Sequence, residues 1–317
     1  MVWKIRYDNQ RNQQEKEPLH TTKKRRLPMR KEAQDARDFN VPVEDHELGI
    51  RYEKYKRILA GLTIMSDIFM RNVLKKQECT EYILQVIMDK QNLQVKEQIL
   101  QKDYKNLQGR SAILDSVVCD MEEKRYNVEI QQENEGASVK RARYHSSLLD
   151  VNTLKEGQNF EELVESYVIF ITRNDVLGYG LPIYHIGRRI KEVTEEFPDE
   201  TYIIYVNAKI QDETTELGRL MHDLQCRNAE EMYSEILAGR VRKLKETPEG
   251  VDSMCREMDE IYNEGIERGL EKGKMEMQQE TVLFMSNLGT PVEQIATVVK
   301  ESVVVVQKWI SESKAVI

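Results

Sequence analysis

The sequence predicts an α/β protein whose sheet is flanked by helices. Three observations support this class. Apolar residues recur at three- and four-residue steps before residue 105, short β-branched runs replace that period in the middle of the chain, and the helical period returns from residue 216 onward. The chain has 317 residues, enough for one large domain or two small ones.

Composition and charge exclude several classes of protein. No apolar run approaches the roughly 18–20 residues of a membrane-spanning helix, and the first ten residues contain no signal-peptide stretch. We therefore expect a cytoplasmic protein with no membrane partner. The four cysteines fit no zinc or disulfide spacing, which favours reduced structural thiols: Cys79, Cys119, Cys226 and Cys255.

The net charge of -8 is unevenly distributed along the chain. Residues 1–60 contain 15 Lys and Arg against 10 Asp and Glu, whereas the other 257 residues contain 32 against 45. Residues 1–45 are predicted to form a flexible basic leader. Its run Lys23-Lys24-Arg25-Arg26 either touches phosphates or belongs to a solvated segment without function.

Residues 50–105 are predicted to be mostly helical. Ile58, Leu62, Met65, Phe69 and Val73 form one helical face, and Ser66-Asp67 is a candidate second helix start. A further helix is predicted from a second apolar face made of Tyr82, Ile83, Val86 and Ile87.

The central part of the chain predicts a hairpin, a helix and two more strands. Residues 111–119 are a β-branched run, and residues 125–131 alternate between apolar and polar side chains. Residues 137–150 return to the helical period, and strands follow at 167–172 and 202–207, separated by a loop. From residue 216 the chain is predicted to be helical, with a turn at 289–291 and a weak helix-turn-helix pattern after it. Gly265, Gly269 and Gly273 mark either a self-association face or a flexible spacer, so a homo-oligomer is one candidate assembly.

Three polar residues interrupt the apolar hairpin strands. Glu129 and Gln131 share one strand face because they are two residues apart. Asp115 joins that face if it pairs opposite either Glu129 or Gln131, and both registers require a three-residue loop. A four-residue loop would turn Asp115 to the opposite face.

Two carboxylates on one face suit a divalent cation. Oxygen ligands of this kind favour Mg²⁺, which keeps several waters and binds phosphate as well. The alternative is that Asp115 is an ordinary strand-end residue and Glu129 faces solvent.

The segment from about 62 to 187, about 40% of the chain, resembles the PD-(D/E)XK nuclease family transposases, also called recombination-promoting nucleases. The resemblance rests on the order and spacing of five stretches: LTIMSDIFMRNVL, KNLQGRSAILDSVVCD, KRYNVEIQ, KRARYHSSLLD and ESYVIFITRNDVLGYGLPIYHI. It implies a restriction-endonuclease-like core, a mixed β-sheet flanked by helices with a helical C-terminal region. It also implies a metal-dependent phosphodiesterase site and DNA as the substrate.

The resemblance assigns roles to individual residues. Asp115 matches the motif aspartate, Glu129 matches the acidic residue of E-x-K, and Asp67 matches an early acidic position. Gln131 stands where the superfamily usually has lysine, which puts the catalytic rate in doubt. The backbone carbonyl of Ile130 is the expected third metal ligand.

These observations predict a nuclease-like domain at 46–210 and a helical region at 211–317. Lys140, Arg141 and Arg143 on the helix after the hairpin either steer the DNA backbone or form a solvated face. The expected function is a Mg²⁺-dependent DNA endonuclease associated with mobile elements or recombination. The alternatives are a catalytically inactive nuclease-derived DNA-binding or interaction protein, and a purely structural helical scaffold.

Overall fold

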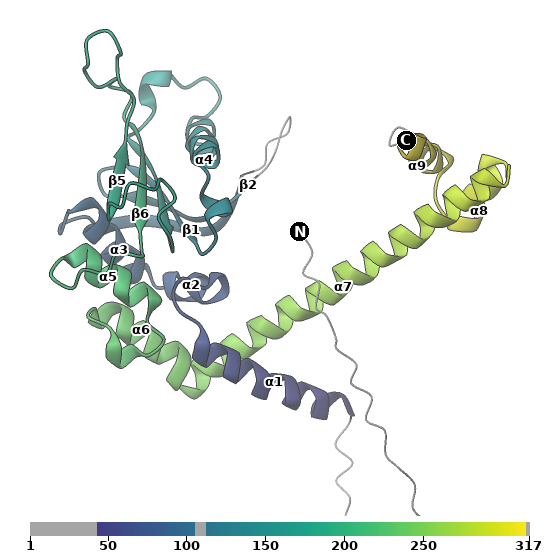
Figure 1. The fold of residues 1–317 in the computed structure, drawn as a ribbon, viewed down its shortest axis with the longest axis horizontal. Helices are drawn as coiled ribbons and strands as arrows, with labels where there is room; N and C mark the ends of the chain where they lie inside the picture. Colours follow the sequence, from purple (N-terminus) through teal and green to yellow (C-terminus); the bar gives the residue numbers. More distant parts are fainter. Residues whose placement is uncertain (1–42, 105–111, 315–317) are drawn as a thin grey trace, which may run out of the picture. The chain divides into compact units, whose positions relative to one another are not determined.

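The computed structural model describes residues 43–104 and 112–314, and its centre is one six-stranded mixed sheet (Figure 1). The strand order is β1-β2-β3-β4-β6-β5. The pairs β1/β2, β2/β3 and β5/β6 are antiparallel, and the pairs β3/β4 and β4/β6 are parallel. The strands are β1 (Val95–Tyr104), β2 (Ala112–Asp120), β3 (Arg125–Gln131), β4 (Ser166–Thr172), β5 (Ile183–Ile186) and β6 (Thr201–Asn207).

Helices precede the sheet, interrupt it once between β3 and β4, and make up the chain after β6. The α-helices are α1 (Val43–Gly61), α2 (Asp67–Leu74), α3 (Gln77–Met88), α4 (Val139–Val151), α5 (Glu216–Gln225), α6 (Glu235–Glu246), α7 (Pro248–Asn287), α8 (Val292–Val299) and α9 (Val303–Lys314). Three short 3-10 turns complete the described part: η1 (Asn134–Ala137), η2 (Phe160–Glu162) and η3 (Ala229–Glu231). The structure is therefore mixed α/β with a helical C-terminal region.

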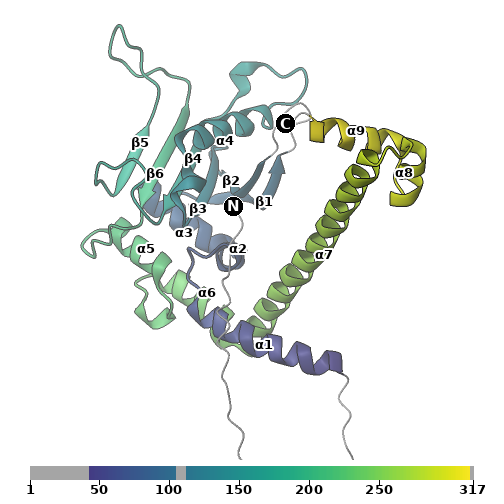
Figure 2. The ribbon, with the colours of Figure 1, turned by 45° about the vertical axis from the view of Figure 1, so that its right-hand side comes forward.

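Both faces of the sheet are covered, which explains why its central strands are buried throughout. On one face Tyr126, Ile169 and Ile204 belong to the same core as Phe69 of α2 and Leu220 of α5. The opposite face packs against α4, which lies alongside β4 and β6 (Figure 2). Glu129 is consequently buried under a helix, so the alternative that it faces solvent is wrong.

The β2–β3 hairpin has a three-residue loop that one carboxylate holds in place. Asp120 Oδ1 accepts hydrogen bonds from the backbone N–H groups of Glu122 and Lys124, each at 2.9 Å, and Tyr126 donates its hydroxyl proton to Oδ2 at 2.8 Å. Glu123 takes the left-handed conformation, with φ of 65°, that three-residue hairpin loops commonly need. This loop sets the register of the whole hairpin.

Three predicted elements were wrong. The helical face predicted from Ile58 to Val73 is divided, because α1 ends at Gly61 and α2 begins at Asp67, the candidate second start. Residues 95–104 form the edge strand β1 rather than the end of a helix. Most of its side chains are only partly buried, so its sequence lacks the alternation by which a half-buried strand is recognised. The stretch expected to be loop between 172 and 202 contains the four-residue strand β5, which is too short to show a period.

The C-terminal helices form a small apolar cluster of their own. Val282 near the end of α7 packs with Ile295 of α8 and Val306 of α9. Gly265, Gly269 and Gly273 lie within the continuous helix α7, so the spacer alternative is wrong, and self-association through this segment stays a prediction. Within the part of the chain that the structure describes, no helix combines the length and the apolar character needed to cross a bilayer.

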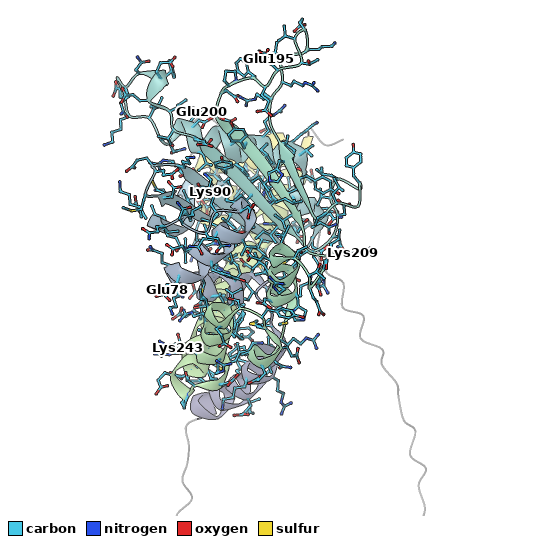
Figure 3. The ribbon with its side chains drawn as sticks, turned by 90° about the vertical axis from the view of Figure 1, so that its left-hand side faces the viewer. Glu78, Lys90, Glu195, Glu200, Lys209 and Lys243 are labelled. Atoms are coloured by element: carbon cyan, nitrogen blue, oxygen red, sulfur yellow. The ribbon has the colours of Figure 1, made fainter. Side chains whose placement is uncertain are left out.

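The basic leader lies outside the described residues except for its last three positions, which belong to α1. Labelled charged side chains on the face shown in Figure 3 carry both signs: Glu78, Lys90, Glu195, Glu200, Lys209 and Lys243. That mixture does not by itself favour a polyanionic partner on this face.

Candidate active site on strands β2 and β3

Asp115 and Glu129 come from adjacent strands and are in contact. The hairpin pairs Ser116 with Val128, and the same register continued by one residue puts Asp115 opposite Glu129. The Asp115 backbone N–H donates to Glu129 Oε1 at 3.2 Å. Of the two registers that would bring these carboxylates to one face, the first is the one adopted. We refer to Asp115 and Glu129 as the carboxylate pair.

The environment of Asp115 disfavours its negative charge. Burial is the largest cause, the charge of Glu129 is the second, and together they raise the pKa of Asp115 to about 7. The charge of Asp67 adds to the rise. Hydrogen bonds from the Gln101 amide, at 3.2 Å, and from the Ile130 backbone N–H oppose it. A positive charge placed beside this group would stabilise its ionised form.

Glu129 is fully buried, yet only one of its carboxylate oxygens is hydrogen-bonded. Oε1 accepts from Asp115 and lies 3.4 Å from His145 Nδ1. Oε2 is buried and has no hydrogen-bond partner within the described residues. The nearest cation is Arg141, whose Nη2 is 3.7 Å from Oε2, longer than a hydrogen bond. A buried carboxylate oxygen without a partner is costly, and it is the type of atom that a metal ion satisfies.

Helix α4 supplies two side chains that lie beside the Glu129 carboxylate. Arg141 and His145 are four residues apart and therefore share one helix face. Arg141 Nε donates to His145 Nε2 at 3.2 Å. Since a guanidinium can only donate, His145 Nε2 accepts from Arg141. The other ring nitrogen, Nδ1, lies 3.4 Å from Glu129 Oε1 and 3.3 Å from Asn127 Nδ2.

The backbone of Ile130 is directed into the gap between the two strands. Its N–H bonds to the Asp115 side chain, beyond the last paired residues of the hairpin, Ser116 and Val128. The N–H and C=O of a strand residue point to the same side, so the Ile130 carbonyl is directed toward Asp115 as well. The role of that carbonyl as a metal ligand stays a prediction.

Gln131 follows on the same face of β3, but its amide is turned toward η1. A Cβ atom added to Gly136 would lie 2.1 Å from Gln131 Oε1, so the Gln131 amide occupies the space that only a glycine leaves. The Gln131 side chain is thus directed toward η1 at the end of the strand.

Asp67 begins α2 and is largely exposed, paired with Arg71 at 2.7 Å. The start of α2 is held near β3 because Gln132 donates its amide to the Met65 carbonyl at 2.9 Å. The Asp67 carboxylate is therefore close enough to affect Asp115 electrostatically, without making a hydrogen bond to it among the described residues.

The three basic residues of α4 differ in their surroundings. Lys140 and Arg143 are exposed, whereas Arg141 is partly buried and directed at Glu129 and His145. Only the first two are free of a contact to the carboxylate pair within the described structure.

Two residues that contact the carboxylate pair, Gln101 and His145, were not predicted as site residues from the sequence. Gln101 was assigned to a helix, and its left-handed conformation, with φ of 49°, interrupts the pairing of β1 opposite Asp115. His145 had one available signal. It follows Arg141 by four residues on the helix directly after the strand that carries Glu129.

Taken together, the arrangement offers a hard, oxygen-rich set of ligands. Two carboxylates come from adjacent strands, and carboxylate oxygens are donors that Mg²⁺ prefers. Glu129 Oε2 is buried without a hydrogen-bond partner among the described residues, with Arg141 Nη2 3.7 Å away, and is an atom that a cation could satisfy.

Comparison with known proteins does not assign a function to this chain. A scan against protein-family models and searches of curated proteins and of solved structures return no match to this chain.

Proposed function

We propose that this protein is a Mg²⁺-dependent DNA endonuclease with a restriction-endonuclease-like core, of the kind associated with mobile elements or recombination. The observation that carries the proposal is the contact within the carboxylate pair, where the Asp115 backbone N–H donates to Glu129 Oε1, while Glu129 Oε2 is buried without a hydrogen-bond partner among the described residues. The resemblance of residues 62–187 to PD-(D/E)XK nuclease family transposases supplies the reaction type.

In this proposal Asp115, Glu129 and the Ile130 carbonyl hold the metal. A bound Mg²⁺ supplies Lewis-acid polarisation of the scissile phosphate and charge neutralisation. The Ile130 N–H and the Gln101 amide fix the Asp115 carboxylate by hydrogen bonds. His145 holds Glu129 in place from the helix side through Nδ1.

Gln131 orients the attacking water in this scheme. Its amide is neutral, so it positions a water by hydrogen bonding but adds no positive charge to the transition state. Lys140 and Arg143 are exposed on α4 and available to neutralise DNA phosphates.

A second candidate function is a nuclease-derived DNA-binding or interaction protein without catalysis. Two observations favour it. The superfamily usually has a lysine that can reach the substrate at the position of Gln131. Here the Gln131 amide packs toward Gly136 instead. Arg141 also already places a positive charge 3.7 Å from Glu129.

The decisive experiment is plasmid nicking by the purified full-length protein with Mg²⁺ and with a chelator. Asp115→Ala is expected to abolish nicking, and Gln131→Ala to lower it on the order of 10²-fold, as the loss of one positioning contact does. Gln131→Lys is expected to preserve or raise the rate. Glu97→Ala, an exposed carboxylate on β1, is the matched control and should nick like the wild type.

Two results separate the candidates. Nicking that survives both the chelator and Asp115→Ala would exclude this metal site. Nicking by Gln131→Lys alone, with an inactive wild type, would favour the second candidate.

A further inference from the structure

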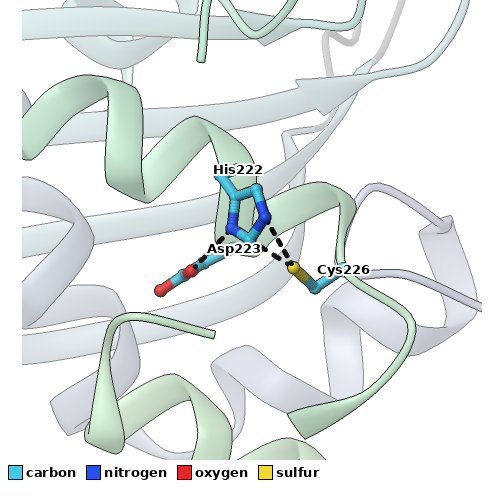
Figure 4. A group of neighbouring side chains, drawn as sticks. All are labelled: His222, Asp223 and Cys226. Atoms are coloured by element: carbon cyan, nitrogen blue, oxygen red, sulfur yellow. Dashed lines mark hydrogen bonds and ion pairs between the residues drawn. The ribbon is translucent and has the colours of Figure 1, made fainter. Parts of the chain in front are cut away.

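A second group of candidate ligands lies at the end of α5, outside the carboxylate pair. His222 and Asp223 are in the last turn of this helix, and Cys226 follows it directly as its cap (Figure 4). His222 and Cys226 are four residues apart, so both side chains are on one side of the helix end. Their ligand atoms and an Asp223 oxygen all lie within 4.8 Å of one another.

The separations match those of ligands around one tetrahedral zinc ion. Bond lengths of about 2.0–2.3 Å place any two ligands of such an ion roughly 3.3–3.8 Å apart. His222 Nδ1 is 3.4 Å from Cys226 Sγ and 3.3 Å from Asp223 Oδ1. Sγ is also 3.7 Å from Nε2, and the Asp223 oxygen of the group is within 4.8 Å of Sγ.

The carboxylate of this group is held by the backbone that leads into α6. The N–H groups of Tyr233 and Ser234 donate to Asp223 Oδ1 and Oδ2, both at 2.8 Å. Metal ligands are commonly fixed by outer hydrogen bonds of this type. Each oxygen keeps a lone pair for a further partner.

The site has both an entrance and room for a fourth ligand. A hollow of about 440 Å³ is lined by His222, Cys226 and Glu231, among others.

We propose that His222, Asp223 and Cys226 bind one Zn²⁺ ion, with water in the fourth position. Thiolate, imidazole and carboxylate together form a donor set that suits zinc better than Mg²⁺. Bound there, the ion connects the end of α5 to the segment entering α6 through Asp223. The site is independent of the carboxylate pair and of its proposed reaction.

Cobalt substitution tests the proposal without any activity measurement. The full-length protein is reduced, freed of metal with a chelator and titrated with Co²⁺. We expect one Co²⁺ per chain to give a thiolate-to-cobalt absorption band and intense tetrahedral d–d bands, both abolished by Zn²⁺. These bands are the readout, because a second Co²⁺ at the carboxylate pair would give no thiolate band. Cys226→Ser should remove the thiolate band. Cys255→Ser, which removes a different buried thiol, should keep it.

His222→Ala provides a variant at a partly exposed side chain, so that folding is not the deciding factor. Loss of a residue that only hydrogen-bonds to a metal ligand lowers metal affinity by roughly 10–100-fold. Loss of His222, a direct ligand, should lower the Co²⁺ affinity by more than that. Asp115→Ala should titrate like the wild type. The absence of a thiolate band in the folded wild type, or its persistence in Cys226→Ser, would overturn the proposal.

Discussion

Replacing Asp115 with asparagine is expected to change the pH dependence of stability. The pKa of this carboxyl is about 7 in the folded protein, against about 3.9 in an unfolded chain. Between these values the folded protein still holds the proton that the unfolded chain has released. The contribution of Asp115 to stability is therefore full below about pH 4 and is lost as the pH rises to about 7.

The magnitude follows from the two pKa values. Ionisation of Asp115 costs the folded state roughly 3 kcal/mol more at pH 8 than at pH 5. Asparagine carries no charge at either pH. The stability of Asp115→Asn relative to the wild type should therefore rise by up to about 3 kcal/mol between pH 5 and pH 8.

Urea unfolding at the two pH values measures this difference. Asp212→Asn is the matched control, because hydrogen bonds from Thr214 keep the pKa of Asp212 below its usual value. That exposed carboxyl is ionised at both pH values, so its variant should differ from the wild type equally at both. An equally constant difference for Asp115→Asn would refute the account of the carboxylate pair.

Adding Mg²⁺ extends the same measurement to the proposed ligand. At pH 8 a Mg²⁺ concentration ten times the dissociation constant should stabilise the wild type by about 1.4 kcal/mol. Asp115→Asn should gain much less, because it lacks one of the two carboxylates.

Three further predictions concern the rest of the chain. Gly136→Ala should change the free energy of unfolding in urea by less than about 1 kcal/mol, because the atom that its Cβ would meet is the flexible end of Gln131. The same variant should slow nicking about as much as Gln131→Ala does, because it displaces the Gln131 amide. Gly269→Ala should raise the thermal stability seen by circular dichroism by up to about 1 kcal/mol, because its Cβ meets nothing within 4 Å in the middle of α7; a loss of stability would contradict this. Deleting residues 1–45 should weaken DNA binding in a salt titration and flatten its salt dependence, because fewer counterions are released; unchanged binding at low salt would leave the leader without that role.

The sequence by itself determined the elements whose side-chain period is strong. Strand β3 was predicted with the bounds that the structure has, because apolar and polar residues alternate over 125–131. The same period put Glu129 and Gln131 on one face. It also limited Asp115 to two registers that would bring it to that face, and the hairpin uses one of them.

Tertiary structure decided which register the hairpin takes and what surrounds the carboxylate pair. The Asp120 carboxylate selects the three-residue loop through hydrogen bonds that no periodicity reveals. Packing of α4 onto the sheet buries Glu129 and directs Arg141 toward it. The sequence alone does not show whether a basic residue on a helix faces solvent or the interior. In the same way, His222 and Cys226 are four residues apart in the sequence, but Asp223 is fixed beside them only because the chain returns at Tyr233 and Ser234. Contacts of this kind join residues from different elements, and local sequence carries no signal for them.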